Sequence, residues 1–319
     1  MSSIRIILTV IIIMMTIISC NEERNKTETI QSKSQPTADI TGNYVSDSYD
    51  KRSEGYDWIA VTISKINENE IFLSVRSRAD NKKPTCTFDS KAYKIDDSTY
   101  YTLAEGKRVI IRFTSKAVEI AAEKPEDETA LYFFCSGGAT VAGTYKKIGE
   151  PLDSAQIDKT SFSKILRLQD MGFNVTSMPK GAKQEIEIYP FGLESVKQLA
   201  DGRVFDAEIE DLDADGFPEV VVYTQSGGNN FGDVIVCSAV SKNAAIQCYF
   251  PPVSKNSKIN SGYNGFDSFT LAERYLVQRF PIYNAGTKTG KIRQISYTLE
   301  KGENTKVFKV KDVIEFNER

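Results

Sequence analysis

Short apolar stretches separated by turn signals run along most of the chain and predict β-strands. The clearest is 219–224 (EVVVYT), an apolar and β-branched run bounded by polar residues, which is the pattern of a well-buried strand. Strands are also predicted on either side of it, at 206–209 and 233–239. The loop 225–232 contains glycine, serine, asparagine and a single large aromatic residue, Phe231. Such a loop cannot form a core, so we expect the flanking strands to present it for recognition.

Residues 40–148 are expected to form a small antiparallel barrel, because short strand patterns recur there at regular spacing. Examples of these patterns lie at 59–63, 70–76, 108–113, 117–120 and 130–135. The first and last stretches, 41–44 and 142–145, resemble the paired ends of a lipocalin-like barrel. We therefore expect the barrel to close by pairing these two stretches.

A polar segment, 149–162, is predicted to link this barrel to a second domain, 163–319. Further strand patterns lie at 163–168, 172–176, 184–189, 268–272, 275–281, 292–299 and 306–316. No convincing long helix interrupts either set. The predicted fold class is all-β, with an N-terminal small antiparallel barrel followed by a C-terminal β-sandwich.

The N-terminus predicts the compartment. Residues 1–19 contain one basic residue and then a short apolar run, which is typical of a signal peptide. The run ends in Ile-Ile-Ser-Cys, which resembles the lipobox of bacterial lipoproteins and implies cleavage before Cys20 and a lipid on Cys20. An uncleaved anchor and an ordinary secretory signal are the alternatives. Residues 20–39 are polar and without periodicity, as expected of a lipid anchor followed by a flexible tether.

These features place the protein in the bacterial cell envelope, where the membrane is a partner through the lipid on Cys20. No later apolar run is long enough to span a bilayer. We expect attachment to the outer membrane, with the domains facing the periplasm or the cell surface. The acidic pair Glu22 and Glu23 resembles surface-export signals of some lipoproteins.

Composition excludes several function classes. The 319 residues carry a net charge of −3 without a stripe of lysine or arginine, so nucleic acid is not an expected partner. The sequence contains no histidine, which removes Ser-His-Asp and Cys-His nucleophile systems and most zinc sites. Carboxylate-based and Ser-Lys chemistry remain, but no spacing argues for either. The sequence therefore predicts that the chain is not an enzyme.

The four cysteines that follow Cys20 are Cys86, Cys135, Cys237 and Cys248. An even number in an exported protein favours two disulfides. Three pairings exist, and the predicted domain boundary favours Cys86–Cys135 and Cys237–Cys248. The second pair flanks a predicted hairpin whose turn is 241–243. Buried free thiols are the alternative.

Three aspartates in one turn, Asp211, Asp213 and Asp215, have the spacing of a calcium loop that ends in a sharp glycine turn at Gly216. The bidentate glutamate of a complete calcium loop would fall near Val222, whereas Glu219 comes three residues early. The alternative is a turn in which the aspartates cap their own backbone amides. We expect no cofactor other than calcium.

Several short motifs occur in order over the second half of the chain, at 192–193, 211–219, 226–232, 249–252, 263–267, 279–283 and 290–294. Together they resemble the periplasmic inhibitors of invertebrate-type lysozyme. The resemblance implies a β-sandwich that inhibits a lysozyme-like hydrolase by inserting a loop into its active-site cleft. The implied binding loop consists of Ser226, Gly227, Gly228, Asn229, Asn230 and Phe231. Secondary binding is implied for Tyr263, Arg279, Tyr283 and Arg293, although the arginines would serve equally well in internal salt bridges.

The loop departs from the Ser-Gly-x-Tyr motif of that family. Ser226 and Gly227 are present, but the aromatic residue comes two positions late and, as Phe231, lacks a hydroxyl. One hydrogen bond to the enzyme is therefore missing or provided by Asn229 or Asn230, a difference of about 1.5–3 kcal/mol or roughly ten- to a hundredfold in affinity. The alternative function is a surface glycan- or peptide-binding lipoprotein that uses the same fold without inhibition.

Overall fold

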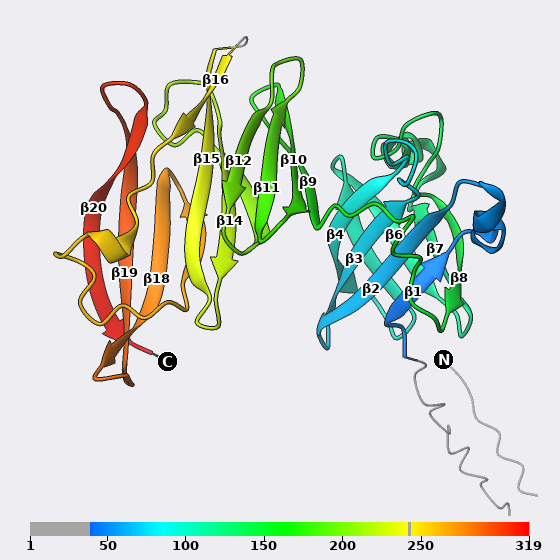
Figure 1. Ribbon diagram of the computed structural model, residues 1–319, viewed down its shortest axis with the longest axis horizontal. Helices are drawn as coiled ribbons and strands as arrows, with labels where there is room; N and C mark the ends of the chain where they lie inside the picture. The colour runs from blue at the N-terminus through cyan, green and yellow to red at the C-terminus, as the bar shows by residue number, and fades with distance from the viewer. Residues whose placement is uncertain (1–38, 242–243, 319) are drawn as a thin grey trace, which may run out of the picture. The chain divides into compact units, whose positions relative to one another are not determined.

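The computed structural model describes residues 39–241 and 244–318, and it is all-β as predicted (Figure 1). The predicted signal peptide, Cys20 and nearly all of the tether lie outside the described residues, as do two of the three residues of the predicted turn 241–243. Among the described residues, no helix has both the length and the apolar character needed to cross a bilayer.

Eight antiparallel strands form a closed barrel in which each strand pairs with the next and the last pairs with the first. They are β1 (Gly42–Val45), β2 (Ile59–Asn67), β3 (Glu70–Ser77), β4 (Thr87–Lys94), β5 (Thr99–Ala104), β6 (Lys107–Phe113), β7 (Ala117–Ala122) and β8 (Gly143–Ile148). Tyr44 in β1 is opposite Lys147 in β8, so the predicted closure of the barrel is confirmed.

Side chains fill the barrel. In β3, Ile71, Leu73 and Val75 point inward and are almost fully buried, as the two-residue period of a strand requires. A 3₁₀ helix, η1 (Asp47–Glu54), follows β1 and packs Tyr49 edge-on against Trp58. The interior is therefore a packed core.

The strand predicted at 130–135 is wrong. This segment contains a short helix, α1 (Thr129–Tyr132), which follows the 3₁₀ helix η2 (Pro125–Asp127). Leu131 and Phe134 both contact the barrel core, and their spacing of three residues suits a helical turn rather than a strand. A short apolar run does not distinguish the two structures by its pattern alone.

The rest of the chain forms three four-stranded antiparallel sheets. The first contains β9 (Phe162–Leu168), β10 (Met171–Lys180), β11 (Lys183–Pro190) and β12 (Val196–Ala200). The second contains β13 (Arg203–Glu210), β14 (Glu219–Ser226), β15 (Phe231–Ser241) and β16 (Ala244–Cys248). After a 3₁₀ helix, η3 (Val253–Lys255), the third contains β17 (Ser268–Ala272), β18 (Tyr275–Asn284), β19 (Thr287–Lys301) and β20 (Lys306–Asn317).

Both faces of the middle sheet are buried (Figure 1). In β14, Val220 and Val222 pack with the first sheet, whereas Val221 and Tyr223 pack with the third sheet. The predicted C-terminal region is confirmed as antiparallel β-structure, but it has three sheets and two cores. The strand β12 is not predicted by the sequence pattern, because its side chains are all partly or fully exposed.

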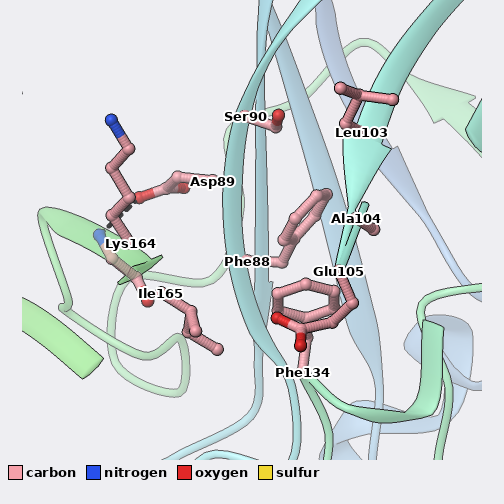
Figure 2. Close-up of a pocket in the computed structure, with 10 residues that line it drawn as sticks. Phe88, Asp89, Ser90, Leu103, Ala104, Glu105, Phe134, Lys164 and Ile165 are labelled. Carbon is pink, nitrogen blue, oxygen red and sulfur yellow. Dashed lines mark hydrogen bonds between the residues drawn. The ribbon is translucent and has the colours of Figure 1, made fainter. Parts of the chain in front are cut away.

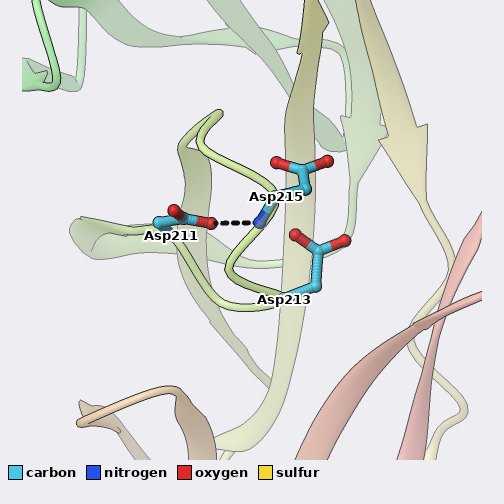
Figure 3. A group of neighbouring side chains, drawn as sticks. All are labelled: Asp211, Asp213 and Asp215. Carbon is cyan, nitrogen blue, oxygen red and sulfur yellow. Dashed lines mark hydrogen bonds between the residues drawn. The ribbon is translucent and has the colours of Figure 1, made fainter.

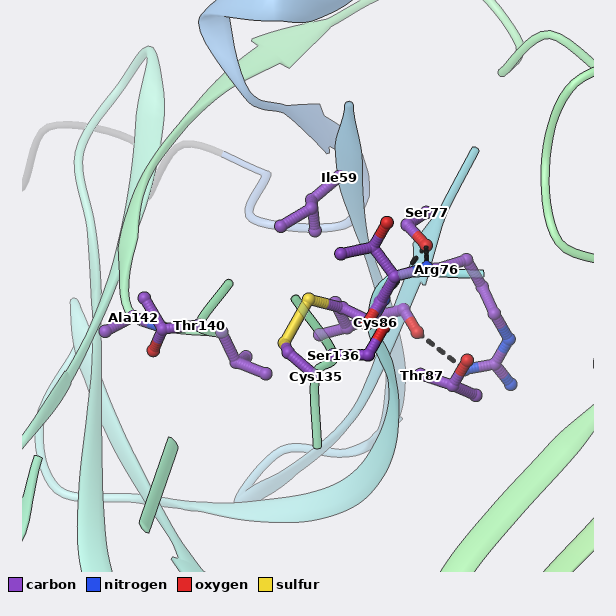
Figure 4. The surroundings of a disulfide bond; sticks show 12 residues. Ile59, Arg76, Ser77, Cys86, Thr87, Cys135, Ser136, Thr140 and Ala142 are labelled. Carbon is purple, nitrogen blue, oxygen red and sulfur yellow. Dashed lines mark hydrogen bonds between the residues drawn. A yellow bond between two sulfur atoms is a disulfide. The ribbon is translucent and has the colours of Figure 1, made fainter. Parts of the chain in front are cut away.

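One predicted disulfide is present and the other is absent. Cys86 and Cys135 are bonded next to the barrel core (Figure 4). Cys237 and Cys248 are buried free thiols, so their predicted pairing is wrong. Cys248 is opposite Val236 rather than Cys237, and this offset of one residue directs the two thiols to opposite faces of the sheet.

Candidate functional site: a hairpin loop on a buried aspartate

The predicted binding loop connects β14 to β15 and has a compact tip. Ser226 pairs with Phe231 across the hairpin, and the Asn230 backbone N–H donates a hydrogen bond to the Gly227 carbonyl at 3.3 Å. Gly227 has a φ of +69°, a conformation that glycine adopts without strain. Phe231 is 40% exposed, and Gly227, Gly228 and Asn230 are exposed beside it. The tip therefore presents one aromatic ring among small and polar groups.

The loop is held by a second segment, 263–267, that also carries part of the family resemblance. The Phe266 backbone N–H donates to the Asn229 carbonyl at 2.6 Å, and Asn229 Nδ2 donates to Asn264 Oδ1 at 3.2 Å. Gly265 lies so close that a Cβ atom there would be 2.5 Å from the Asn229 carbonyl oxygen. Asn229 therefore anchors the loop through its carbonyl and one side-chain N–H, whereas Asn230 is the more exposed of the two.

Asp267 fixes the base of the loop. Its carboxylate is buried and accepts hydrogen bonds from the Gly232 backbone N–H at 2.8 Å, from Tyr263 Oη at 2.7 Å and from Gln278 Nε2 at 2.6 Å. Burial raises the pKa of Asp267, and these three donors oppose the increase. Because Gln278 lies on β18, the carboxylate connects the hairpin of the middle sheet to the third sheet.

Tyr263 supports the loop from below. Its ring contacts Phe231 edge-on, with centroids 5.9 Å apart, and it contacts Phe280 at 4.8 Å. Because its hydroxyl donates to Asp267, the polar end of the side chain points into the protein. Burial raises the pKa of this hydroxyl. Tyr263 therefore positions Phe231, and a direct role for Tyr263 in binding stays a prediction.

The two arginines predicted to assist binding differ in their surroundings. Arg293 is internal: it donates to Glu315 at 2.6 Å and to the Ile259 and Ser261 carbonyls at 2.7 Å. Arg279 is exposed, and its Nε donates to Gln294 Oε1 at 2.6 Å.

The fourth predicted secondary residue, Tyr283, stacks on Phe266, with centroids 6.2 Å apart. Arg279, unlike Arg293, is exposed and forms no ion pair among the described residues.

The three aspartates of the calcium-like turn lie together, as their spacing predicts (Figure 3). Asp211 accepts hydrogen bonds from the backbone N–H groups of Asp215 and Gly216, each at 3.1 Å, which is the capping role. Nζ of Lys306 lies 2.7 Å from Asp213 and 2.8 Å from Asp215. A lysine ammonium from β20 thus lies among the carboxylates.

The donor set is only partly suited to calcium. Oδ1 of Asp213 is buried and has no hydrogen-bond partner among the described residues, so one oxygen is available. Calcium requires six to eight oxygen ligands, and here it would compete with the Lys306 ammonium and with the amides bound to Asp211. The structure does not test the calcium prediction made from the sequence, but the Lys306 ammonium argues against tight binding, and no step of the proposed function depends on calcium.

A pocket of about 130 Å³, which the sequence analysis missed, is lined by residues of β4, β5 and β9 together with Phe134 (Figure 2). Its charged groups are already engaged. Asp89 forms two hydrogen bonds of 2.7 Å with Arg76 and accepts a third from the Ser163 N–H at 2.8 Å. Lys164 donates to Asp206 at 2.8 Å. These hydrogen bonds join β9 to the barrel. They leave few charged groups of the pocket available to bind a ligand.

No protein-family model and no curated protein matches the chain. Among solved structures, the chain is similar to the catalytic domain of an alpha-L-arabinofuranosidase of family GH62 from Coprinopsis cinerea. The sequence identity is 10%, the TM-score is 0.25, and the match covers 78% of this chain and 83% of that one. A similarity this low assigns neither a fold nor an activity to the chain.

The expectation that the chain is not an enzyme nevertheless needs correction. The sequence predicted that the chain is not an enzyme, whereas the similar structure is a glycoside hydrolase catalytic domain. The absence of histidine excludes several catalytic systems, but it does not exclude those built on carboxylates. The chain contains 43 aspartate and glutamate residues. The exclusion of an enzyme is therefore withdrawn.

Proposed function

We propose that the chain is a lipid-anchored inhibitor of a lysozyme-like peptidoglycan hydrolase, with an enzyme of the invertebrate type as the favoured partner. The observation that supports this proposal most directly is the contact between the hairpin loop and the segment 263–267. Asn229 and Asn264 are 35 residues apart in sequence and yet hydrogen-bonded. Two segments that separately resemble the inhibitor family thus form one surface.

The loop has the properties of an inserting element. Its base is fixed by Asp267 and its middle by Asn229, so binding would order few additional groups and the entropic cost would be small. Phe231 supplies an aromatic ring for the apolar floor of a cleft. The side chain of Asn230 is exposed and has no partner among the described residues, so it is the donor that replaces the missing tyrosine hydroxyl in this proposal.

The scaffold in this proposal is a layered β-sandwich whose middle sheet carries the loop. Because both faces of β14 are buried, the hairpin extends from the most enclosed strand of the second domain. The predicted lipid on Cys20 would tether this scaffold to the outer membrane. The tether would keep the inhibitor in the envelope, where peptidoglycan hydrolases act.

The test is an inhibition titration of an invertebrate-type lysozyme with residues 21–319, which retain every described residue. We expect Phe231→Ala to raise the inhibition constant by at least about thirtyfold, because hot-spot aromatic residues contribute about 2 kcal/mol or more. Asn230→Ala should raise it about tenfold. Leu199→Ala, an exposed apolar residue on β12, is the matched control and should have no effect.

Two results would contradict the proposal. One is the absence of inhibition at micromolar protein with invertebrate-type, chicken-type and goose-type lysozymes. The other is inhibition that Phe231→Ala and Asn230→Ala leave unchanged, which would place the binding surface away from the hairpin loop.

A further inference from the structure

A second pocket lies on the outer face of the third sheet and has a volume of about 300 Å³. Pro281, Ile292 and Phe316 are neighbours on β18, β19 and β20, and they form an apolar row across the sheet. Ser268 and Arg279 form the next row on the same face. The pocket therefore has an apolar half and a polar half, which is the general composition of a small-ligand site.

Two aromatic rings border the apolar half. Phe266 and Phe316 are each 40% exposed and line the same pocket. Phe266 is held in place because its ring stacks on Tyr283 and its backbone N–H is bonded to Asn229. It adopts a φ of +60°, a strained conformation for a bulky residue that tends to persist where the surroundings impose it. A fixed ring suits stacking against a flat apolar ligand surface.

The polar half is positively charged. Arg279 uses Nε to bind Gln294, and no carboxylate of the described residues forms an ion pair with its guanidinium. Lys288 lies at the same pocket and has one acidic neighbour, Glu318, at 3.8 Å. Two cations thus face one carboxylate. The guanidinium retains N–H groups in the fork arrangement that binds a carboxylate through both oxygens.

We propose that this pocket binds a sugar ring that carries a carboxylate. The C–H face of a pyranose would stack on the exposed rings, and the carboxylate would bind Arg279. The exposed hydroxyl of Ser268 lies beside Arg279 and provides a donor and an acceptor for a sugar hydroxyl. The volume accommodates one ring rather than a long chain. The site does not include the hairpin tip, so sugar binding can be measured without a lysozyme.

The test compares acidic sugars with their uncharged counterparts by chemical-shift titration of residues 21–319. Glucuronic acid is paired with glucose, and N-acetylmuramic acid is paired with N-acetylglucosamine. We expect at least one acid to bind about tenfold or more tightly than its counterpart, with shifts at Phe266 and Arg279. Whichever of the two acids binds more tightly shows whether the site prefers a uronic acid or a sugar with a lactyl ether.

Arg279→Gln should remove the preference for the acid, whereas Arg274→Gln should retain it. Arg274 is the matched control, because it is exposed in the turn at the other end of the same β17–β18 hairpin. Phe316→Ser should weaken the binding of the acidic sugar and of its uncharged counterpart to the same extent.

Equal binding of acid and neutral sugar would overturn the proposal, and so would the absence of shifts with every probe at up to about 20 mM. So would a dimer of the chain that Phe316→Ser converts to a monomer, since the pocket would then be an interface between two copies.

Discussion

Nζ of Lys306 lies 3.0 Å from Oε1 of Glu219, a carboxylate with no solvent exposure. Ser238 Oγ and the Leu212 N–H donate to the same carboxylate, at 2.6 and 2.8 Å. Burial raises the pKa of Glu219 and these donors oppose the increase. For Lys306 burial lowers the pKa, but the surrounding carboxylates outweigh it and the pKa is raised. This buried ion pair thus joins the last strand to the middle sheet, beside the backbone hydrogen bonds that Tyr249 forms with Lys306 and Phe308.

Replacing Lys306 with methionine should destabilise the protein by about 3 kcal/mol, because removing one partner of a buried ion pair leaves the other charge unpaired. The measurement is the free energy of unfolding in urea. Lys309→Met is the matched control: this lysine pairs with Glu300 at 2.8 Å, but both side chains are about half exposed. The control should change stability by less than about 0.5 kcal/mol. Equal stability of the two variants would show that the buried pair contributes nothing.

The position of Lys306 also makes a prediction about calcium. In the unmutated chain we expect the melting temperature to be the same in EDTA and in millimolar calcium, because the ammonium competes for Asp213 and Asp215. Lys306→Gln removes this competitor, and calcium should then raise the melting temperature, since a ligand that binds only the native state stabilises it. A rise in the unmutated chain would instead assign the turn as a calcium site.

The local pattern of apolar and polar residues was sufficient to predict most of the strands. The run 219–224 predicted a buried strand because the five residues after Glu219 are apolar, aromatic or β-branched, and β14 is buried on both faces. That pattern does not say which sheets cover the two faces, so a sandwich was predicted where three sheets are present. The short strand β12 was missed because it has no fully buried side chain.

Long-range contacts explain most of what the sequence did not predict at the candidate site. Lys306 reaches Asp215 across 91 residues, and no motif connects them. Asp267 was part of a motif, but its role depends on Gly232 and Gln278, which lie on two different sheets. The error at Cys237 and Cys248 arose because proximity in a hairpin says nothing about which face each side chain occupies.

The disulfide pattern predicts a thiol count. Residues 21–319 should react with no thiol reagent while folded and should expose two thiols when unfolded without reductant, from Cys237 and Cys248. Cys86→Ser with Cys135→Ser should lower the free energy of unfolding by about 4 kcal/mol, the loop-closure value for a bridge that spans 49 residues. Cys237→Ala should leave the sensitivity of stability to reductant unchanged. Four thiols in the unfolded, unreduced chain would contradict the pairing.

Buried tyrosines predict a loss of stability at high pH. Burial, assisted by the nearby charge of Asp39, raises the pKa of Tyr44 to about 12, and its hydroxyl donates to the Ile40 carbonyl at 2.8 Å. The unfolded chain loses this proton near pH 10, so the stabilising contribution is complete below about pH 10 and is lost as the pH rises through 12.

Between these values, the free energy of unfolding should fall by up to roughly 1.4 kcal/mol per pH unit for this hydroxyl. Tyr44→Phe should make the decline shallower, whereas Tyr56→Phe, at an exposed tyrosine, should not. A free energy of unfolding that stays constant up to pH 12 would contradict the prediction.

Asp267→Asn should loosen the hairpin loop without altering any residue at its tip. Oδ2 of Asp267 accepts from Gly232 and Tyr263, while Oδ1 accepts from Gln278. An asparagine side chain has only one acceptor oxygen. Its NH₂ group must therefore face at least one of these hydrogen-bond donors, and that hydrogen bond is lost. Rotation of the Gln278 amide would compensate only at the cost of the hydrogen bond that Tyr297 donates to its Oε1 at 2.8 Å. We expect the free energy of unfolding to fall by about 2 kcal/mol.

Amide hydrogen exchange distinguishes this effect from general destabilisation. The Gly232 amide should exchange faster in Asp267→Asn by more than the loss of global stability requires, because its acceptor is weakened directly. Asp312→Asn, at an exposed carboxylate of β20, is the matched control and should leave exchange at Gly232 unchanged. If inhibition depends on a fixed loop, Asp267→Asn should also weaken inhibition while Phe231 and Asn230 remain in place. Unchanged exchange at Gly232 would show that the loop keeps its conformation without this carboxylate.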